Sequence, residues 1–106
     1  MCRTTTRTYS DDTQEVLTYL ALSIRAARLE QRLTAEALAM MVGVSRSTLQ
    51  RIEKGDPKVE LGAVFQIAYL LGINPLGHAK ESLPLLIRLT EEKLTLLPRA
   101  NRASAA

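Results

Sequence analysis

The residues best suited to chemistry lie between positions 45 and 54, where polar and basic side chains surround two aliphatic ones. Arginine can donate paired hydrogen bonds to guanine N7 and O6, glutamine suits adenine, and short hydroxyls can approach a base or a phosphate. These residue types favour recognition of double-stranded DNA, and the alternative is an ordinary solvated polar face. The candidate DNA-binding residues are Ser45, Arg46, Ser47, Thr48, Gln50, Arg51 and Lys54.

Two short helices are predicted to hold this segment, because apolar residues recur three and four positions apart over residues 34–54. Leu38 and Val42 share one helical face, and the same spacing restarts at Leu49 and Ile52. Because the spacing stops at Val42 and restarts at Leu49, two helices with a break near Gly43 are predicted.

The helix starts and the turn are specified by individual residues. Thr34 and Ser45 stand where an N-cap hydroxyl accepts a backbone N–H group, and Leu33 and Val44 precede them as apolar staples. Gly43 tolerates the left-handed backbone that ends one helix and allows the next to begin. The sequence therefore predicts a helix-turn-helix connection.

This pattern resembles the Cro/C1-type (XRE) helix-turn-helix regulators. In that family a small residue, a turn glycine and two core aliphatics recur at set offsets, matched here by Ala39, Gly43, Leu49 and Ile52. The resemblance covers about residues 16–73. It implies an all-α fold, a compact lambda repressor-like domain of four to five helices. It also implies a homodimer that binds a palindromic operator in double-stranded DNA.

A narrower likeness is to the HipB-like antitoxins that accompany HipA-type kinase toxins. It is carried by GVSRSTLQRIEKGDP at residues 43–57 and by a following helix that ends in LLGI at residues 70–73. It implies a repressor of its own operon with a HipA-like kinase toxin as partner. A plain autoregulator without a toxin is the alternative. One position departs from the family, because Ala35 stands where a glutamine often binds phosphate.

Length and composition narrow the class of protein. The chain has 106 residues and a net charge of +3, with an isoelectric point near 9.4. This length suits one domain with tails, and the modest basicity is compatible with nucleic acid without requiring it. Because no apolar run reaches the length of a signal peptide or a membrane span, we expect a cytoplasmic protein with no membrane partner. The family resemblance implies that it works at the bacterial nucleoid.

Catalysis, cofactor binding and metal binding have no candidate residues. The single Cys2 excludes an internal disulfide framework and a multi-cysteine zinc site. His78, the only histidine, has no ligand at metal-binding spacing and is expected in a surface loop. We therefore expect no enzyme activity, no metal and no cofactor. A rival function is a protein-interaction adaptor with little DNA affinity, which Ala35 and the modest charge leave open.

Four segments are expected along the chain. They are a disordered N-terminal arm at 1–10, the DNA-binding domain at 11–74, a C-terminal helical segment for dimerisation or partner binding at 75–98, and a disordered tail at 99–106. The N-terminal arm carries Arg3 and Arg7, which could reach a DNA backbone or belong to a solvated tail.

The first helix is expected to begin near Asp12, with Asp12 as cap and Glu15 completing a capping box, and to end near Glu30. Arg25 and Arg28 place positive charge near the C-terminal end of this helix, where it interacts favourably with the helix dipole. The family resemblance adds an ion pair between Arg28 and a glutamate at position 53. The expected buried stripe is Val16, Leu17, Leu20, Ile24 and Ala27.

Two further expectations concern the core. Met40 and Met41 could form an adaptable binding surface, but core filling is the preferred interpretation. A fourth helix over residues 61–71 should close the core, and Glu60 precedes it as an imperfect cap with a favourable charge. Its expected core positions are Leu61, Val64, Phe65, Ala68 and Leu71.

The segment 82–97, SLPLLIRLTEEKLTLL, predicts a last helix with Ser82 as cap and Pro84 in the first turn. It offers more apolar surface than a closed four-helix core needs, so part of it should cover another subunit or a partner. The alternative is a fifth helix that completes its own core. The dimer interface is thus expected in this helix or in the fourth one.

Overall fold

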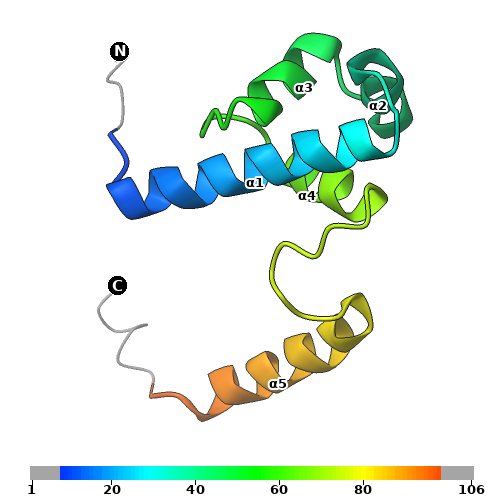
Figure 1. Cartoon of the computed structure of the whole chain (residues 1–106). Helices are drawn as coiled ribbons and strands as arrows, with labels where there is room; N and C mark the ends of the chain where they lie inside the picture. Colours follow the sequence, from blue (N-terminus) through cyan, green and yellow to red (C-terminus); the bar gives the residue numbers. More distant parts are fainter. Residues whose placement is uncertain (1–7, 99–106) are drawn as a thin grey trace. The chain divides into compact units, whose positions relative to one another are not determined.

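The computed structural model of the chain describes residues 8–98, so Arg3, Arg7 and the tail at 99–106 lie outside the described residues. The all-α fold with a compact helix-turn-helix domain is confirmed (Figure 1). The chain divides into two compact units, residues 1–75 and 76–106. The elements are α1 (Asp11–Glu30), α2 (Ala35–Val42), α3 (Arg46–Glu53), α4 (Leu61–Leu70), the 3-10 helix η1 (Lys80–Ser82) and α5 (Leu83–Leu96).

Helix α1 begins one residue before the predicted start. The Ser10 hydroxyl accepts the Thr13 N–H at 3.2 Å, so Ser10 is the cap, and Asp11 and Asp12 occupy the first turn. The predicted cap at Asp12 with Glu15 is therefore wrong. The physical reason is that Ser10 has the extended backbone that a cap requires, and the two aspartates still favour the positive end of the helix dipole.

The turn between α2 and α3 is built as predicted. The Thr34 hydroxyl accepts the Ala37 N–H at 3.0 Å, and the Ser45 hydroxyl accepts the Thr48 N–H at 3.0 Å. Gly43 ends α2 with a left-handed backbone at φ 79°, which a residue with a Cβ adopts only at a cost. Two caps and one glycine therefore fix how the chain passes from α2 into α3.

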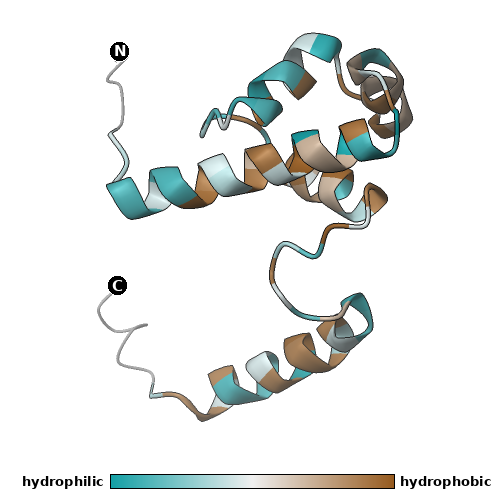
Figure 2. Cartoon of the chain, viewed as in Figure 1, coloured by the Kyte–Doolittle hydropathy of each residue, from teal (hydrophilic) through white to brown (hydrophobic). Residues whose placement is uncertain are grey.

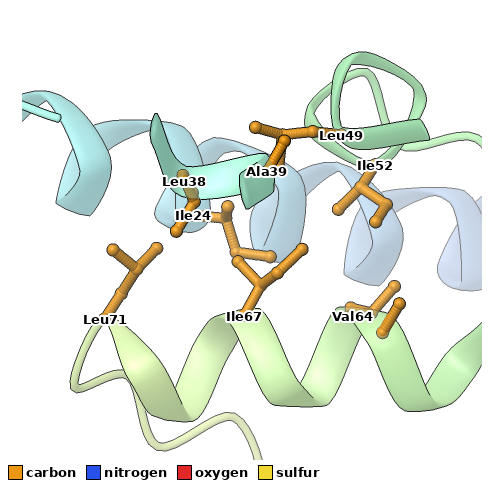
Figure 3. Packing of buried hydrophobic residues seen from close by; sticks show 9 residues of the cluster. Ile24, Leu38, Ala39, Leu49, Ile52, Val64, Ile67 and Leu71 are labelled. Carbon is orange, nitrogen blue, oxygen red and sulfur yellow. The ribbon is translucent and has the colours of Figure 1, made fainter. Parts of the chain in front are cut away.

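Side chains from all four helices of the first unit meet in one core (Figure 3). Each helix contributes one of the four largest fully buried side chains, which are Ile24, Leu38, Leu49 and Ile67. Full burial of such a side chain stabilises the fold by about 2 kcal/mol. Leu49 and Ile52 lie on the side of α3 that packs into the core. The opposite side of α3 must therefore face away from the domain.

Burial in α1 and α2 differs from the sequence expectation in two places. Val16 is 65% exposed, because the α1 side chains in the core begin a turn later, at Leu20. Met40 is 82% exposed and Met41 is also exposed, so core filling is wrong for both. Each methionine lies two positions, about 200° around the helix, beyond Leu38 or Ala39, which occupy the core side of α2.

Helix α4 presents a slightly different face from the one predicted. Its buried residues are Ala63, Val64, Ile67 and Ala68, whereas the expected core residue Leu61 is exposed and Phe65 is half-buried. The small Ala63 and the branched Ile67 lie four apart on the core side, which turns Leu61 outward. Glu60 makes no side-chain cap bond, as expected.

The second unit contains η1 and α5. Ser82 does not cap α5, because its backbone is already helical and η1 leads directly into the longer helix. None of the α5 residues is buried, and hydrophobic residues recur along its length (Figure 2). The apolar side chains of α5 are therefore available to contact a partner.

An ion pair ties α1 to α3, as the family resemblance implied. Arg28 Nε donates to Glu53 Oε2 at 2.7 Å, and Arg28 Nη2 donates to Glu53 Oε1 at 3.1 Å. The third group, Nη1, donates to the Leu33 carbonyl at 3.0 Å. The two side chains are only 11% and 9% exposed, and the hydrogen bond to Glu53 raises the pKa of Arg28. One guanidinium therefore joins the end of α1, the loop that leads into α2 and the end of α3.

Replacing Glu53 by Ala should lower the free energy of unfolding by about 2 kcal/mol, because the nearly buried Arg28 charge loses both carboxylate acceptors. Urea unfolding followed by circular dichroism measures this loss. The matched control is Glu30→Ala, an exposed glutamate in the last turn of α1, which should change stability by less than about 0.5 kcal/mol. An equally small loss for Glu53→Ala would contradict a structural role for the pair.

Candidate nucleic-acid interface

The side of α3 that faces away from the core gathers most of the predicted DNA-binding residues. On an ideal helix these side chains spread over the half opposite Leu49 and Ile52. We call this set the recognition surface, and all its members are exposed: Arg46, Ser47, Gln50, Arg51 and Lys54. It offers arginine and amide groups that can read base edges together with a lysine suited to phosphate.

The other two predicted residues, Ser45 and Thr48, hold the beginning of α3. The Ser45 hydroxyl accepts the Thr48 N–H and donates to the Thr48 hydroxyl at 2.9 Å, and it lies 3.3 Å from the Ser47 hydroxyl. These contacts stabilise the first turn of α3. Ser47 therefore has the more available hydroxyl of the three, whereas Ser45 and Thr48 order the turn that carries Arg46.

A shallow hollow of about 370 Å³ adjoins the recognition surface on the side of Arg46. We call it the cationic hollow. Since Arg28 neutralises Glu53, the excess positive charge comes from Arg25, Arg46 and Lys54, and an anion such as a phosphate suits this charge. Its lining residues are Arg25, Arg28, Ala35, Arg46, Gln50, Glu53 and Lys54.

Arg25 is a member of this hollow that sequence reasoning did not assign to the site. In the sequence, the helix dipole of α1 was a sufficient explanation for it. Only the packing of α1 against α3 brings Arg25 beside Arg46, so no local pattern could have identified it. Ala35 lines the same hollow at the first position of α2, where related regulators often carry a glutamine.

Arg51 lies on the other side of the recognition surface, about 140° around α3 from Arg46. Its Nε donates to Asp56 Oδ2 at 2.8 Å, and Asp56 Oδ1 accepts the Lys58 N–H at 2.8 Å. The Lys58 N–H and then the Arg51 guanidinium hold the pKa of Asp56 below its usual value. Sequence reasoning assigned Asp56 only to the turn after α3, because a contact across five residues leaves no periodic signal.

Residues 8–98 show no sign of a metal site or a membrane span. No group of three or more His, Cys, Asp or Glu side chains in this range is arranged to hold a metal ion. His78 lies exposed in the loop before η1, as expected. No helix in the same range combines the length and the apolar character that crossing a membrane requires.

Comparison with known proteins supports the assignment of the recognition surface to a DNA-binding domain. No curated protein sequence matches the chain. The model of a helix-turn-helix family matches residues 24–77, about half of the chain, from the core section of α1 to the loop after α4. The match includes both helices of the motif and the whole recognition surface. The chain therefore belongs to the Cro/C1-type (XRE) helix-turn-helix family of DNA-binding transcription regulators.

Proposed function

We propose that the protein is a sequence-specific repressor that binds a palindromic operator as a homodimer and regulates its own operon. The observation that carries this proposal is the recognition surface, which combines groups for reading bases with a neighbouring cationic hollow for phosphate. Base contacts specify a sequence, whereas phosphate contacts position the protein on the duplex. A surface that offers both kinds of group suits a specific operator.

Individual roles follow from position on α3. Arg46 is the first residue of the helix, and in this motif the N-terminal residues of the recognition helix meet base edges in the major groove. We assign Arg46 with Ser47 to base edges, and Arg51 to a base or a nearby phosphate on the other side of the helix. Gln50 suits an adenine between them, and Lys54 at the end of α3 suits a phosphate.

A homodimer is supported by the geometry of DNA. One recognition helix reads only a few base pairs, and two helices about 34 Å apart meet successive major grooves of a palindrome. We place the dimer contact in α5, which carries two apolar rows that are exposed except for the half-buried Leu86. One row contains Leu86, Ile87 and Leu94, which line a shallow hollow along the helix together with Thr90 and Glu91. The other row contains Leu85, Leu89 and Leu96, spaced four and seven apart.

The finer proposal is that the protein is the antitoxin of a HipA-like toxin–antitoxin module. Its support is the sequence likeness at residues 43–57 and 70–73, together with apolar surface on α5 beyond one row. Purification from the native host should then recover a kinase-fold protein encoded beside this one. The complex should bind the operator more tightly than the free protein through avidity. Recovery of the chain alone, with no toxin-like neighbour in the operon, would leave a plain autoregulator.

Replacing Arg46 by Ala should weaken operator binding by about 1 to 3 kcal/mol and relax the preference at one base pair, with a much smaller loss on random DNA. The reason is that a bidentate contact to a base is lost while the fold is kept. Affinities for both DNAs, measured at one salt concentration, test this. The control is Lys80→Ala, an exposed cation in η1, which should change neither affinity.

Two results would contradict the role assigned to Arg46. An equal fractional loss on operator and random DNA would mean that Arg46 binds a phosphate. No loss on either DNA would favour a protein-interaction adaptor that has kept the fold without the affinity.

Deleting residues 80–106 should give monomers, because the deletion removes both apolar rows of α5. Sedimentation at micromolar concentration measures the oligomeric state. The full-length variant Ile87→Glu with Leu94→Glu should dissociate as well, because it places charges in one row. The control Thr95→Glu adds a charge outside that row and should remain dimeric. A dimer of the truncated chain would show that the interface lies elsewhere.

A further inference from the structure

We propose that Asp56 is a positioning residue for DNA recognition, whose carboxylate holds Arg51 through Nε and presents the two Nη groups to a guanine. This inference rests on the proposed function, since it requires α3 to read bases. It goes further by assigning Arg51 to a base edge and by giving a role in specificity to a residue in the turn after α3.

The turn after α3 fixes Asp56 without help from the arginine side chain. Gly55 adopts a left-handed backbone at φ 79°, and the Asp56 N–H then donates to the Arg51 carbonyl at 3.1 Å. The Asp56 Oδ1 accepts the Lys58 N–H at 2.8 Å. Because backbone groups set the position of this carboxylate, its second oxygen is a fixed acceptor beside α3.

Asp56 Oδ2 accepts a hydrogen bond from Arg51 Nε at 2.8 Å, so the carboxylate contacts only one edge of the guanidinium. Within residues 8–98, neither Nη group of Arg51 donates a hydrogen bond to the protein. The Arg51 side chain is 50% exposed, and that of Asp56 is 28% exposed. The pair of Nη groups therefore remains available to solvent, and two parallel N–H donors match guanine N7 and O6.

Holding the guanidinium in advance reduces the entropy that an arginine loses when it binds. A free arginine side chain loses rotamer freedom when it is fixed, and pre-organisation avoids part of that loss. A phosphate can be approached from many directions, so a fixed direction brings little advantage there. A base edge accepts only one orientation, which is why the arrangement favours readout of guanine.

Charge alone predicts the opposite effect for Asp56. A carboxylate near a polyanion opposes binding, so its removal should strengthen the affinity for any DNA. The Lys58 N–H and Arg51 both lower the pKa of Asp56, so the group is ionised at neutral pH. If Asp56 orients Arg51, its removal should instead weaken binding to the operator. The two explanations therefore predict changes of opposite sign on the same DNA.

The test uses the full-length protein and the variant Asp56→Asn. Asparagine keeps an oxygen for the Lys58 N–H, so the turn is retained, but the charged acceptor for Arg51 is lost. We expect operator affinity to fall about five- to ten-fold, within the range of one oriented base contact. Affinity for random DNA at the same salt concentration should be unchanged or higher. The control Asp12→Asn removes a matched charge from exposed α1 and should leave the ratio of the two affinities unchanged.

A second comparison uses Arg51→Ala with and without Asp56→Asn. Once Arg51 is absent, Asp56→Asn should no longer weaken operator binding and should raise the affinity for both DNAs alike. The proposal is overturned if Asp56→Asn raises both affinities by one factor while Arg51 is present. It is also overturned if Arg51→Ala lowers both affinities equally, since Arg51 would then bind phosphate. A wild-type protein without operator preference would refute the proposed function itself, which separates the two failures.

Discussion

The burial of Leu49 and Ile52 is the constraint on which the rest of the structure depends. These two side chains are the core side of α3, and their position decides which residues the helix presents outward. The ion pair of Arg28 with Glu53 then joins the end of the same helix to α1. Capping by Ser45 orders the other end. The recognition surface is therefore held by the core and by both helix ends, and a rigid surface of this kind can read a sequence.

The acidic side chains beside the recognition surface are matched by basic ones. Glu53 is bound by Arg28, and Asp56 is bound by Arg51. Within residues 8–98, Arg25, Arg46 and Lys54 form no ion pair and supply the local positive charge. A protein with a net charge of only +3 can therefore concentrate an anion-binding surface in one place. Net charge alone could not have indicated this.

The sequence predicts features that depend on local chemistry. The caps at Thr34 and Ser45 and the turn at Gly43 were identified because each requires a particular residue type at a particular place. Burial was harder, because tertiary packing decides which apolar residues of an apolar helix face the core. Met40 and the outward face of α4 were missed for this reason. The places of Arg25 and Asp56 beside α3 also depend on folding, which single-helix periodicity does not contain.

We propose that the outward side of α3 and its cationic surroundings bind DNA. The most direct measurement is the affinity for the DNA upstream of the gene as a function of salt concentration. A dimer that uses Arg25, Lys54 and a further cation on phosphate would make about six phosphate contacts. We expect a loss of affinity of about a thousand-fold between about 50 and 200 mM salt. An affinity that barely changes over this range, or no binding to this DNA at all, would contradict DNA binding by this surface.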